Sequence, residues 1–496
     1  NQEVIRMILP FFIIIPLLTA FIITLIAGER DNWAVILSIL AVVSLVILSV
    51  YCFVSLNGRT LVYEMGRWQA PIGIILAVDA LSAFMLMIVS IIALTAIMFS
   101  VQYIRNLSPS WKYYALFMLL TGGMNGVIAT GDLFNLFVFV EITLFAAYGL
   151  VAYGNRAEEF EASFKYAIMG SISSTLVLVG IGIIYSATST LTMALIAERL
   201  PQNPTVMYWS GGLFVAAFGL KAAIMPFHAW LPDAHSSAPA PISAMLSGVL
   251  IKALGVYVLI RLFFNVFGEM PVFSEVFLVL GTVSMVIGVF LALGQWDVKR
   301  LLAYHSISQI GYIIIGVGLG TTLGLLGAVF HLLNHAIFKA LLFLNAGSLE
   351  MALGTRDLRQ MGKVSKALPV TSFTSMVASL SISGIPPFNG FFSKLIIFIA
   401  AIQIGRPVVA FLAGLGSLLT LASFMKVQRY GFHGEKTVTA DQAKVGWGMR
   451  AAMIVLAILC LATSALIIPG IREVTLDPVV EVIMNKTGYI TRVLGR

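Results

Sequence analysis

Residues 221–235 read KAAIMPFHAWLPDAH, and residues 383–394 read SGIPPFNGFFSK. Both stretches place a Pro-Phe pair inside or beside an apolar segment, with Pro226 in the first and Pro386 and Pro387 in the second. Proline removes a helical hydrogen bond and clashes with the preceding turn. The two stretches therefore predict two interrupted helices.

A lysine lies close to each predicted break. Lys221 precedes the first break and Lys394 follows the second. If these helices lie in lipid, the backbone groups that proline frees must be met by protein or by water that lines a cavity. A pair of Gly/Pro-interrupted helices in corresponding halves of a chain points to the ion site of an inverted-repeat transporter. Lysine and Pro-Phe occur in opposite order in the two stretches, as an inverted pair would show.

The composition places these breaks in a membrane. The chain has 496 residues, of which 59% are hydrophobic and only 10% are charged, and its mean hydropathy is +0.99. A soluble domain is roughly 25% charged. The net charge of +8 is spread over many short loops, so no nucleic-acid partner is expected. Cys52 and Cys460 both lie in apolar runs and fit no metal spacing. The sequence predicts an all-α polytopic membrane protein.

Segments long enough to span the membrane recur along the whole chain. A spanning helix needs roughly 20 mostly apolar residues, and about fourteen segments meet this requirement. The segment at 369–402 is overlong and carries SGIPPFNG in its middle, which favours a broken helix there. The segments are 7–27, 34–55, 77–100, 112–129, 132–153, 162–186, 209–230, 240–265, 274–294, 301–319, 323–347, 369–402, 405–425 and 447–469.

Loop charges give a predicted orientation. Lysine and arginine are frequent in the loops after odd-numbered segments, for example Lys299 and Arg356. The loops after even-numbered segments hold fewer: Arg59, Arg67, Arg199, Arg406 and, if it lies outside its segment, Arg261. Cytoplasmic loops carry an excess of these residues. The odd loops are therefore predicted to face the cytoplasm of a prokaryotic cell, with both chain termini outside.

Two regions are too polar to span. The stretch 187–206, ATSTLTMALIAERLPQNPTV, is expected to form a short surface helix. The tail from residue 470 is less apolar than the segments before it. We expect this tail to pack along the membrane surface or against a partner.

Five charged residues remain deep inside apolar segments. A charge at a helix centre costs roughly 2.5–3.5 kcal/mol on insertion scales, so such residues must pair, be hydrated or lose their charge. Snorkelling to an interface is an alternative for the lysines nearest the segment ends, whereas a glutamate side chain is too short for it. Asp79 and Asp132 lie near helix starts and are expected to be caps or interface residues. The five are Glu141, Lys221, Lys252, Lys339 and Lys394.

Residues 330–343, FHLLNHAIFKALLF, place His331, His335 and Lys339 four residues apart. On a helix such residues form one stripe. A zinc site would need a third ligand that the stretch lacks, so no metal is expected. Histidine titrates near neutral pH, and a stripe of it is typical of a proton relay. Two histidines that merely hydrogen-bond to neighbouring helices are the alternative.

The stretch 221–261, KAAIMPFHAWLPDAHSSAPAPISAMLSGVLIKALGVYVLIR, resembles the signature of the proton-translocating antiporter-like subunits. This family occurs in respiratory complex I, in Mrp-type multisubunit Na+/H+ antiporters and in membrane-bound hydrogenases. The length, the number of segments, Glu141 in the fifth segment and the PPFNGFFSK break agree with it. The sequence is most similar to the Mrp D subunit and its hydrogenase-type counterpart.

The resemblance implies a fold of two inverted five-helix repeats, each with a broken helix. It divides the chain into helices one to three (1–111), a first repeat of helices four to eight (112–266), a second repeat of helices nine to thirteen (267–430), and helix fourteen with the tail (431–496).

The resemblance also implies roles for single residues. Glu141 matches the glutamate that pairs with the broken-helix lysine, Lys221, and Lys252 matches the central relay residue of the eighth helix. Lys394 matches the terminal lysine of the second half-channel. The residues of the stripe, His331, His335 and Lys339, match the axis that connects the halves.

These residues predict a subunit that moves protons through a multisubunit complex in the cell membrane, together with other membrane subunits. Na+ prefers oxygen ligands and the buried set is mostly nitrogen, so H+ is the expected ion and Na+ is left open. A conventional secondary transporter of a small solute is the alternative, but it would not need a Lys/His line through the membrane. Nothing in the sequence offers haem, flavin or iron–sulfur ligation, so no cofactor is expected. Whether the complex includes a redox enzyme is left open.

Overall fold

The computed structural model describes residues 6–26, 31–56, 58–105, 109–200, 203–434 and 444–496. Within these ranges, eleven continuous helices are long and apolar enough to cross a membrane. The prediction of an all-α polytopic membrane protein is confirmed. Of the fourteen predicted spans, those at 209–230 and 369–402 are interrupted, and the helix at Ser110–Ala129 is too polar on average to join the eleven.

The first part of the chain combines three long helices with a small β-hairpin. The hairpin strands pair antiparallel, with Leu61 opposite Val78, and the amide of Gly131 donates to the Ile75 carbonyl at 2.9 Å, which ties the hairpin to the following bundle. The elements are α2 (Phe11–Leu25), α3 (Asp31–Ser55), β1 (Leu61–Glu64), η1 (Met65–Arg67), β2 (Ile75–Val78) and α4 (Ala80–Tyr103).

The next part contains the first interrupted helix and a helix with three wide, π-helical turns. Its elements are α5 (Ser110–Ala129), α6 (Leu133–Val151), α7 (Ala157–Thr188), α8 (Met193–Arg199), α9 (Pro204–Lys221), α10 (Trp230–Ser237), α11 (Ala240–Met245), η3 (Leu246–Leu250), η4 (Lys252–Val256), α12 (Tyr257–Ile260) and η5 (Arg261–Val266). The last five form one continuous buried rod from Ala240 to Val266.

The remaining part contains the second interrupted helix and the tail, with residues 435–443 of the predicted last division outside the described residues. Its elements are α13 (Pro271–Leu293), α14 (Val298–Gly318), α15 (Thr322–Leu353), α16 (Pro369–Ser383), α17 (Asn389–Gln403), α18 (Pro407–Val427), η6 (Gln428–Phe432), α19 (Trp447–Ala462), η8 (Thr463–Ile467), α20 (Pro469–Thr475), α21 (Asp477–Met484) and α22 (Lys486–Leu494).

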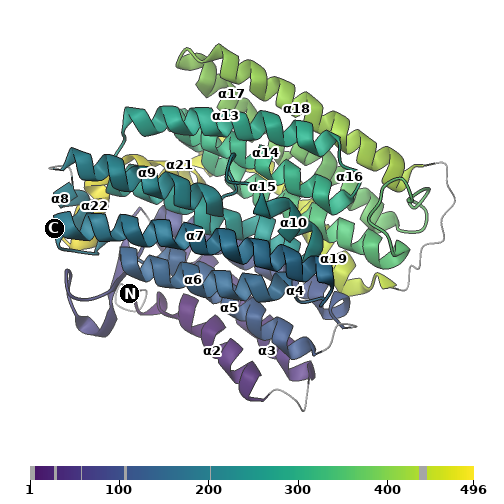
Figure 1. Ribbon diagram of the computed structural model, residues 1–496, viewed down its shortest axis with the longest axis horizontal. Helices are drawn as coiled ribbons and strands as arrows, with labels where there is room; N and C mark the ends of the chain where they lie inside the picture. The colour runs from purple at the N-terminus through teal and green to yellow at the C-terminus, as the bar shows by residue number, and fades with distance from the viewer. Residues whose placement is uncertain (1–5, 27–30, 57, 106–108, 201–202, 435–443) are drawn as a thin grey trace.

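Helix α15 lies at the centre of the molecule. In Figure 1, α2 and α3 lie at one edge and α17 and α18 at the opposite edge, with α14 and α15 between them. Helix α15 packs against α14, α16, α17, α11, α19 and α4. It is buried along almost its whole length, so any polar side chain on it must find partners inside the protein.

Side chains at the helix starts explain several element boundaries. Asp79 accepts from the amide of Ser82 at 3.0 Å, and Asp132 accepts from that of Asn135 at 2.8 Å. Such caps satisfy amides that have no partner within the helix. The prediction that both aspartates are caps is confirmed.

Of two predictions about the polar regions, the one for 187–206 is wrong in part, and the one for the tail stays a prediction. The stretch 187–206 does contain a short helix, α8, but Met193–Ala197 are buried rather than on the surface. The tail forms α20 to α22, and α21 packs against α4 and α15 of the same chain. Apolar side chains on one face of α21, such as Val479 and Ile483, are fully buried there, so the tail completes the bundle itself.

Candidate functional site

The first interruption separates α9 from α10 at Pro226, as predicted. Two side chains meet the backbone groups that the break frees. Trp230 Nε1 donates to the Leu220 carbonyl at 2.9 Å, and the Met225 amide donates to Ser284 Oγ on α13, also at 2.9 Å. Protein groups thus replace the lost helical bonds, which lets an interrupted helix persist inside a membrane.

Lys221 is the last residue of α9 and only 3% exposed. Its Nζ donates to Ser174 Oγ of α7 at 3.3 Å. Ser174 Oγ in turn donates to Glu141 Oε1 of α6. Among the described residues, Glu141 and Lys221 form no direct ion pair, and the hydroxyl of Ser174 lies between them. Sequence reasoning named the acid and the base but missed the group that joins them.

The second interruption separates α16 from α17 around Pro386 and Pro387, also as predicted. Lys394 of α17 folds back across the break, and its Nζ donates to the Ile382 carbonyl at 2.7 Å, in the last turn of α16. The same ammonium lies 4.7 Å from the centre of the Tyr312 ring. A helix C-terminus carries partial negative charge, so this end of α16 favours a cation.

Lys252 occupies the first position of η4 and is fully buried. Its Nζ donates to the Ser247 carbonyl at 2.5 Å, and the Ser247 and Ser306 hydroxyls lie 2.7 Å apart, which connects the rod to α14. Wide π-helical turns occur frequently at functional sites, because they shift side chains out of the regular helical register.

The predicted stripe forms along the core face of α15. The rings of His331 and His335 lie nearly parallel with their centres 6.3 Å apart. His331 contacts Ser393 Oγ through Nδ1 at 2.9 Å and Gln309 Oε1 through Nε2 at 3.2 Å. The stripe therefore touches both α17 and α14 at this point.

The other two members of the stripe have different surroundings. Neither ring nitrogen of His335 has a hydrogen-bond partner among the described residues. The Nζ of Lys339 donates to the Leu302 carbonyl of α14 and lies 5.6 Å from the centre of the Phe343 ring.

Neither snorkelling nor metal binding accounts for these residues. Lys339 and Lys394 are 0% and 2% exposed, so neither snorkels to an interface. His305, a further buried histidine, contacts Ser423 Oγ at 2.8 Å through Nε2, and its Nδ1 has no hydrogen-bond partner among the residues that the structure describes. In the part of the chain that the structure describes, no group of three or more His, Cys, Asp or Glu side chains could hold a metal ion.

The arrangement suits proton transfer better than ion coordination. Lysine, imidazole and hydroxyl groups lie at both breaks, in the rod and on α15. Each of these groups can take part in proton transfer through its hydrogen bonds. A neutral imidazole has one donor and one acceptor nitrogen, so it can take a proton on one side and release it from the other.

Two features of the sequence could have pointed to the missing partners. Ser174 lies in the hydroxyl-rich run SISST at 171–175, inside an otherwise apolar segment. Gln309 lies in the segment 301–319, which also holds His305. Neither signal shows which neighbour the side chain will meet.

A buried pair joins the rod to α4. Arg261, placed by the sequence at the edge of a loop, is 4% exposed and donates to both oxygens of Asp79 at 2.6 and 2.7 Å. Tyr489 of the tail lies under the guanidinium, 5.2 Å from ring centre to Cζ. The sequence left open whether Arg261, near the end of the predicted segment 240–265, belongs to a loop; the structure places it in the buried rod, where the acidic cap of α4 offers it a counter-charge.

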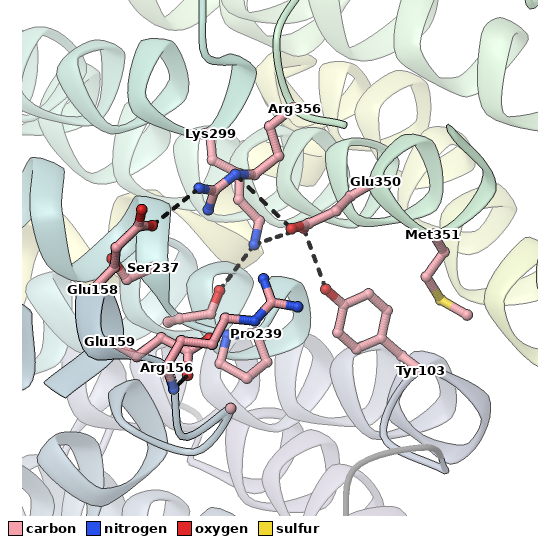
Figure 2. Close-up of a pocket in the computed structure, with 12 residues that line it drawn as sticks. Tyr103, Arg156, Glu158, Glu159, Ser237, Pro239, Lys299, Glu350, Met351 and Arg356 are labelled. Atoms are coloured by element: carbon pink, nitrogen blue, oxygen red, sulfur yellow. Dashed lines mark hydrogen bonds and ion pairs between the residues drawn. The ribbon is translucent and has the colours of Figure 1, made fainter. Parts of the chain in front are cut away.

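Lys299 is likewise not a free loop cation. It is 1% exposed and pairs with Glu350 Oε2 at 2.9 Å. Figure 2 shows this pair together with Arg356 and Tyr103 in the wall of a cavity.

A polytopic bundle with two interrupted helices and a buried line of lysines and histidines defines a membrane subunit of the ion-translocating, antiporter-like class. The model of the family described as NADH:quinone oxidoreductase/Mrp antiporter, transmembrane, matches residues 130–420, which include both breaks. The chain belongs to this family, and the resemblance recognised in the sequence is confirmed.

Relatives and solved structures agree with this assignment. The chain is 37% identical over 444 residues to the D subunit of a Na+/H+ antiporter from Alkalihalophilus pseudofirmus, a match that covers 88% of this chain and 90% of that one. It superimposes on a chain of the Mrp complex from Dietzia sp. DQ12-45-1b with a TM-score of 0.91, at 30% identity and 99% coverage of both. For a chain of the membrane-bound sulfane sulfur reductase, an archaeal respiratory membrane complex, the TM-score is 0.90 at 31% identity, with 99% of this chain and 100% of that one covered.

Proposed function

We propose that this chain is an antiporter-like subunit of the D type, that it works inside a multisubunit membrane complex, and that it moves protons. Its similarity to the D subunit of a Na+/H+ antiporter, and to chains of the Mrp and sulfane sulfur reductase complexes, supports both the function and the need for other membrane subunits.

The contact of Glu141, Ser174 and Lys221 beside the first break carries the proposal. While the carboxylate faces Lys221 through the Ser174 hydroxyl, it stabilises the protonated lysine. When the contact opens, Lys221 loses this stabilisation and releases its proton. The acid therefore acts as the switch, and the lysine as the group that it controls.

The proton then follows the buried line. Lys252 receives it from the first break, the stripe on α15 carries it across the centre, and Lys394 releases it at the second break. Water bridges the gaps, because side chains alone do not span these distances. The division into two inverted repeats, 112–266 and 267–430, is part of this proposal and gives each half one break and two lysines of the buried line, Lys221 and Lys252 in the first and Lys339 and Lys394 in the second.

The ion that passes through this chain is H+ in our proposal. The buried line offers mostly nitrogen, whereas Na+ prefers oxygen ligands. Any sodium movement would use another subunit or a shared interface. Whether the complex spends an ion gradient or builds one in a redox reaction depends on which subunits accompany the chain.

We place the chain in the plasma membrane of a prokaryotic cell, with the loops after the odd-numbered segments in the cytoplasm and both termini outside. The ends of the third, fifth, seventh, ninth and eleventh predicted segments meet around one cavity, which supports a common side for these loops. Residues 1–5 lie outside the described part of the chain.

The test compares Glu141→Gln with Glu161→Gln in the assembled complex, reconstituted in liposomes that contain a pH-sensitive dye. Glu161 is exposed on α7, and its pair with Lys165 is of the kind that contributes little. We expect Glu141→Gln to abolish proton transport, while Glu161→Gln transports like the wild type and both variants retain their partner subunits. Proton transport at the wild-type rate in Glu141→Gln would rule out the proposed switch.

A further inference from the structure

A cavity of about 260 Å³ opens at the end of the molecule where α4, α7, α10, α14 and α15 meet. Three acidic and three basic side chains line it, as Figure 2 shows, together with the backbone of residues 237–239. This backbone links α10, the second half of the interrupted helix, to the rod that carries Lys252. The charged side chains are Arg156, Glu158, Glu159, Lys299, Glu350 and Arg356.

Glu350 lies at the inner wall of this cavity. Its side chain is 22% exposed, whereas that of its partner Lys299 is 1% exposed. Lys299 Nζ also donates to the Ala238 carbonyl at 3.0 Å, and the Tyr103 hydroxyl donates to Glu350 at 3.4 Å. The carboxylate is thus held at the boundary between the cavity and the protein interior.

Glu350 also continues the stripe on α15. It follows Lys339 by eleven residues, which is about three helical turns, or about 16 Å along the axis, so both lie on the same face. Phe343 lies between them on this face, and its ring centre is 5.6 Å from Lys339 Nζ. An aromatic side chain therefore separates the buried lysine from the acid at the cavity.

His235 lies beside this aromatic barrier. It is fully buried near the end of α10, two residues before the cavity wall begins, and its ring meets that of Phe343 edge-on at 5.6 Å. Neither of its ring nitrogens has a hydrogen-bond partner in the described ranges of the chain. A buried imidazole without partners is costly for a purely structural role.

We propose that Glu350 and His235 form an access branch that connects the charged cavity to Lys339, with Phe343 as its gate. The Glu350 carboxylate takes a proton from a hydronium ion in the cavity, which becomes water. Bridging water then carries the proton from Glu350 to one ring nitrogen of His235, because His235 makes no direct hydrogen bond among the described residues. The imidazolium then releases the proton on its other nitrogen to the neutral amine of Lys339, and His235 returns to its neutral form. Lys299 is a positioning residue that holds Glu350 at the cavity wall. An apolar constriction of this kind can gate by excluding water.

This branch rests on the proposed function, so the experiment separates the two. In the reconstituted complex, Glu350→Gln and His235→Phe should each lower the rate of proton transport on the order of 100-fold, the lower range for a positioned proton-transfer group. Glu350→Asp keeps a carboxylate and should restore most of the rate. Glu158→Gln changes an exposed acid of the same cavity and should transport like the wild type.

The comparison with Glu141→Gln decides which proposal fails. If Glu141→Gln is inactive while Glu350→Gln and His235→Phe transport normally, the access branch is wrong and the proposed function stands. If Glu141→Gln transports normally, the proposed function itself is wrong. Co-purification of the partner subunits checks that each variant assembles.

A labelling measurement tests the branch without relying on transport. Met351 lines the cavity, whereas the native Cys52 and Cys460 are buried. Met351→Cys should react with a membrane-impermeant maleimide from one side of the membrane only, and Phe343→Ala should raise the passive proton leak of the vesicles. A cysteine at 351 that stays unreactive from both sides, or a Phe343→Ala complex as proton-tight as the wild type, would overturn the access branch.

Discussion

Removal of a single hydroxyl at Ser174 should uncouple the acid from the base at the first break. Ser174 is buried on α7, donates to Glu141 and accepts from Lys221 at 3.3 Å. Ser174→Ala removes one oxygen atom and leaves both charged residues in place. Alanine is the best helix former, so α7 itself should not suffer.

The size of the effect follows from the contacts that are lost. A hydrogen bond to a charged group contributes about 1.5–3 kcal/mol. The bond to Ser174 is the only one that Lys221 Nζ makes among the described residues. A loss of about 2 kcal/mol corresponds to a factor of roughly 30 in an equilibrium. We therefore expect the fraction of complexes in which Glu141 stabilises protonated Lys221 to fall by one to two orders of magnitude, and proton transport to fall with it.

The assay is dye-monitored proton uptake by liposomes that contain the assembled complex. Ser171→Ala, at an exposed position one turn earlier on α7, is the matched control and should transport like the wild type. Ser174→Thr retains the hydroxyl and should keep most of the activity. If Ser174→Ala is as active as Ser171→Ala, the reasoning that the hydroxyl transmits the charge of Glu141 is refuted.

Two further predictions concern other buried contacts. Asp79→Asn leaves Arg261 without its counter-charge and should destabilise the protein by about 3–5 kcal/mol. A thiol-reactive dye that reports exposure of the two buried cysteines should show a lower unfolding temperature for this variant. An unfolding temperature equal to that of the wild type would contradict the stabilising role of the pair. Gly384→Ala places a side chain on a backbone with φ +76° and within 3.2 Å of Lys394 Cδ, so proton transport should fall. Gly405→Ala is the control, because Gly405 has a similar φ of +73° but no atom within 4 Å of an added Cβ. An equal loss of transport in both variants would show that backbone strain, and not the contact with Lys394, is responsible.

The membrane-spanning segments and the two breaks could be predicted because their signals are local. An apolar run of sufficient length must lie in lipid or in the core, and a proline within it must interrupt the helix wherever the segment packs. The break at Pro226 and the break at Pro386 and Pro387 were found for this reason. The same reasoning failed for α8, because its buried face depends on neighbours that lie far away in the sequence.

Partners of the buried charges could not be predicted in the same way. The sequence left open whether Arg261, near the end of an apolar segment, lies in a loop, because its counter-charge Asp79 lies 182 residues earlier in the chain. Lys299 was counted as a loop cation because the sequence does not show that Glu350 will lie beside it. Position along the chain says how deep a residue lies, but not which residue it will face.

The sequence by itself determined that the chain is a helical membrane protein, where its helices break, and which few charged residues lie too deep for lipid to solvate, because hydrophobicity and proline act on each segment separately. The tertiary structure alone decided how those residues are connected. Ser174 lies between Glu141 and Lys221, the end of α16 receives Lys394, and Glu350 holds Lys299. Such hydrogen bonds and ion pairs form only where packing brings donor and acceptor atoms from distant parts of the chain within about 3 Å of one another.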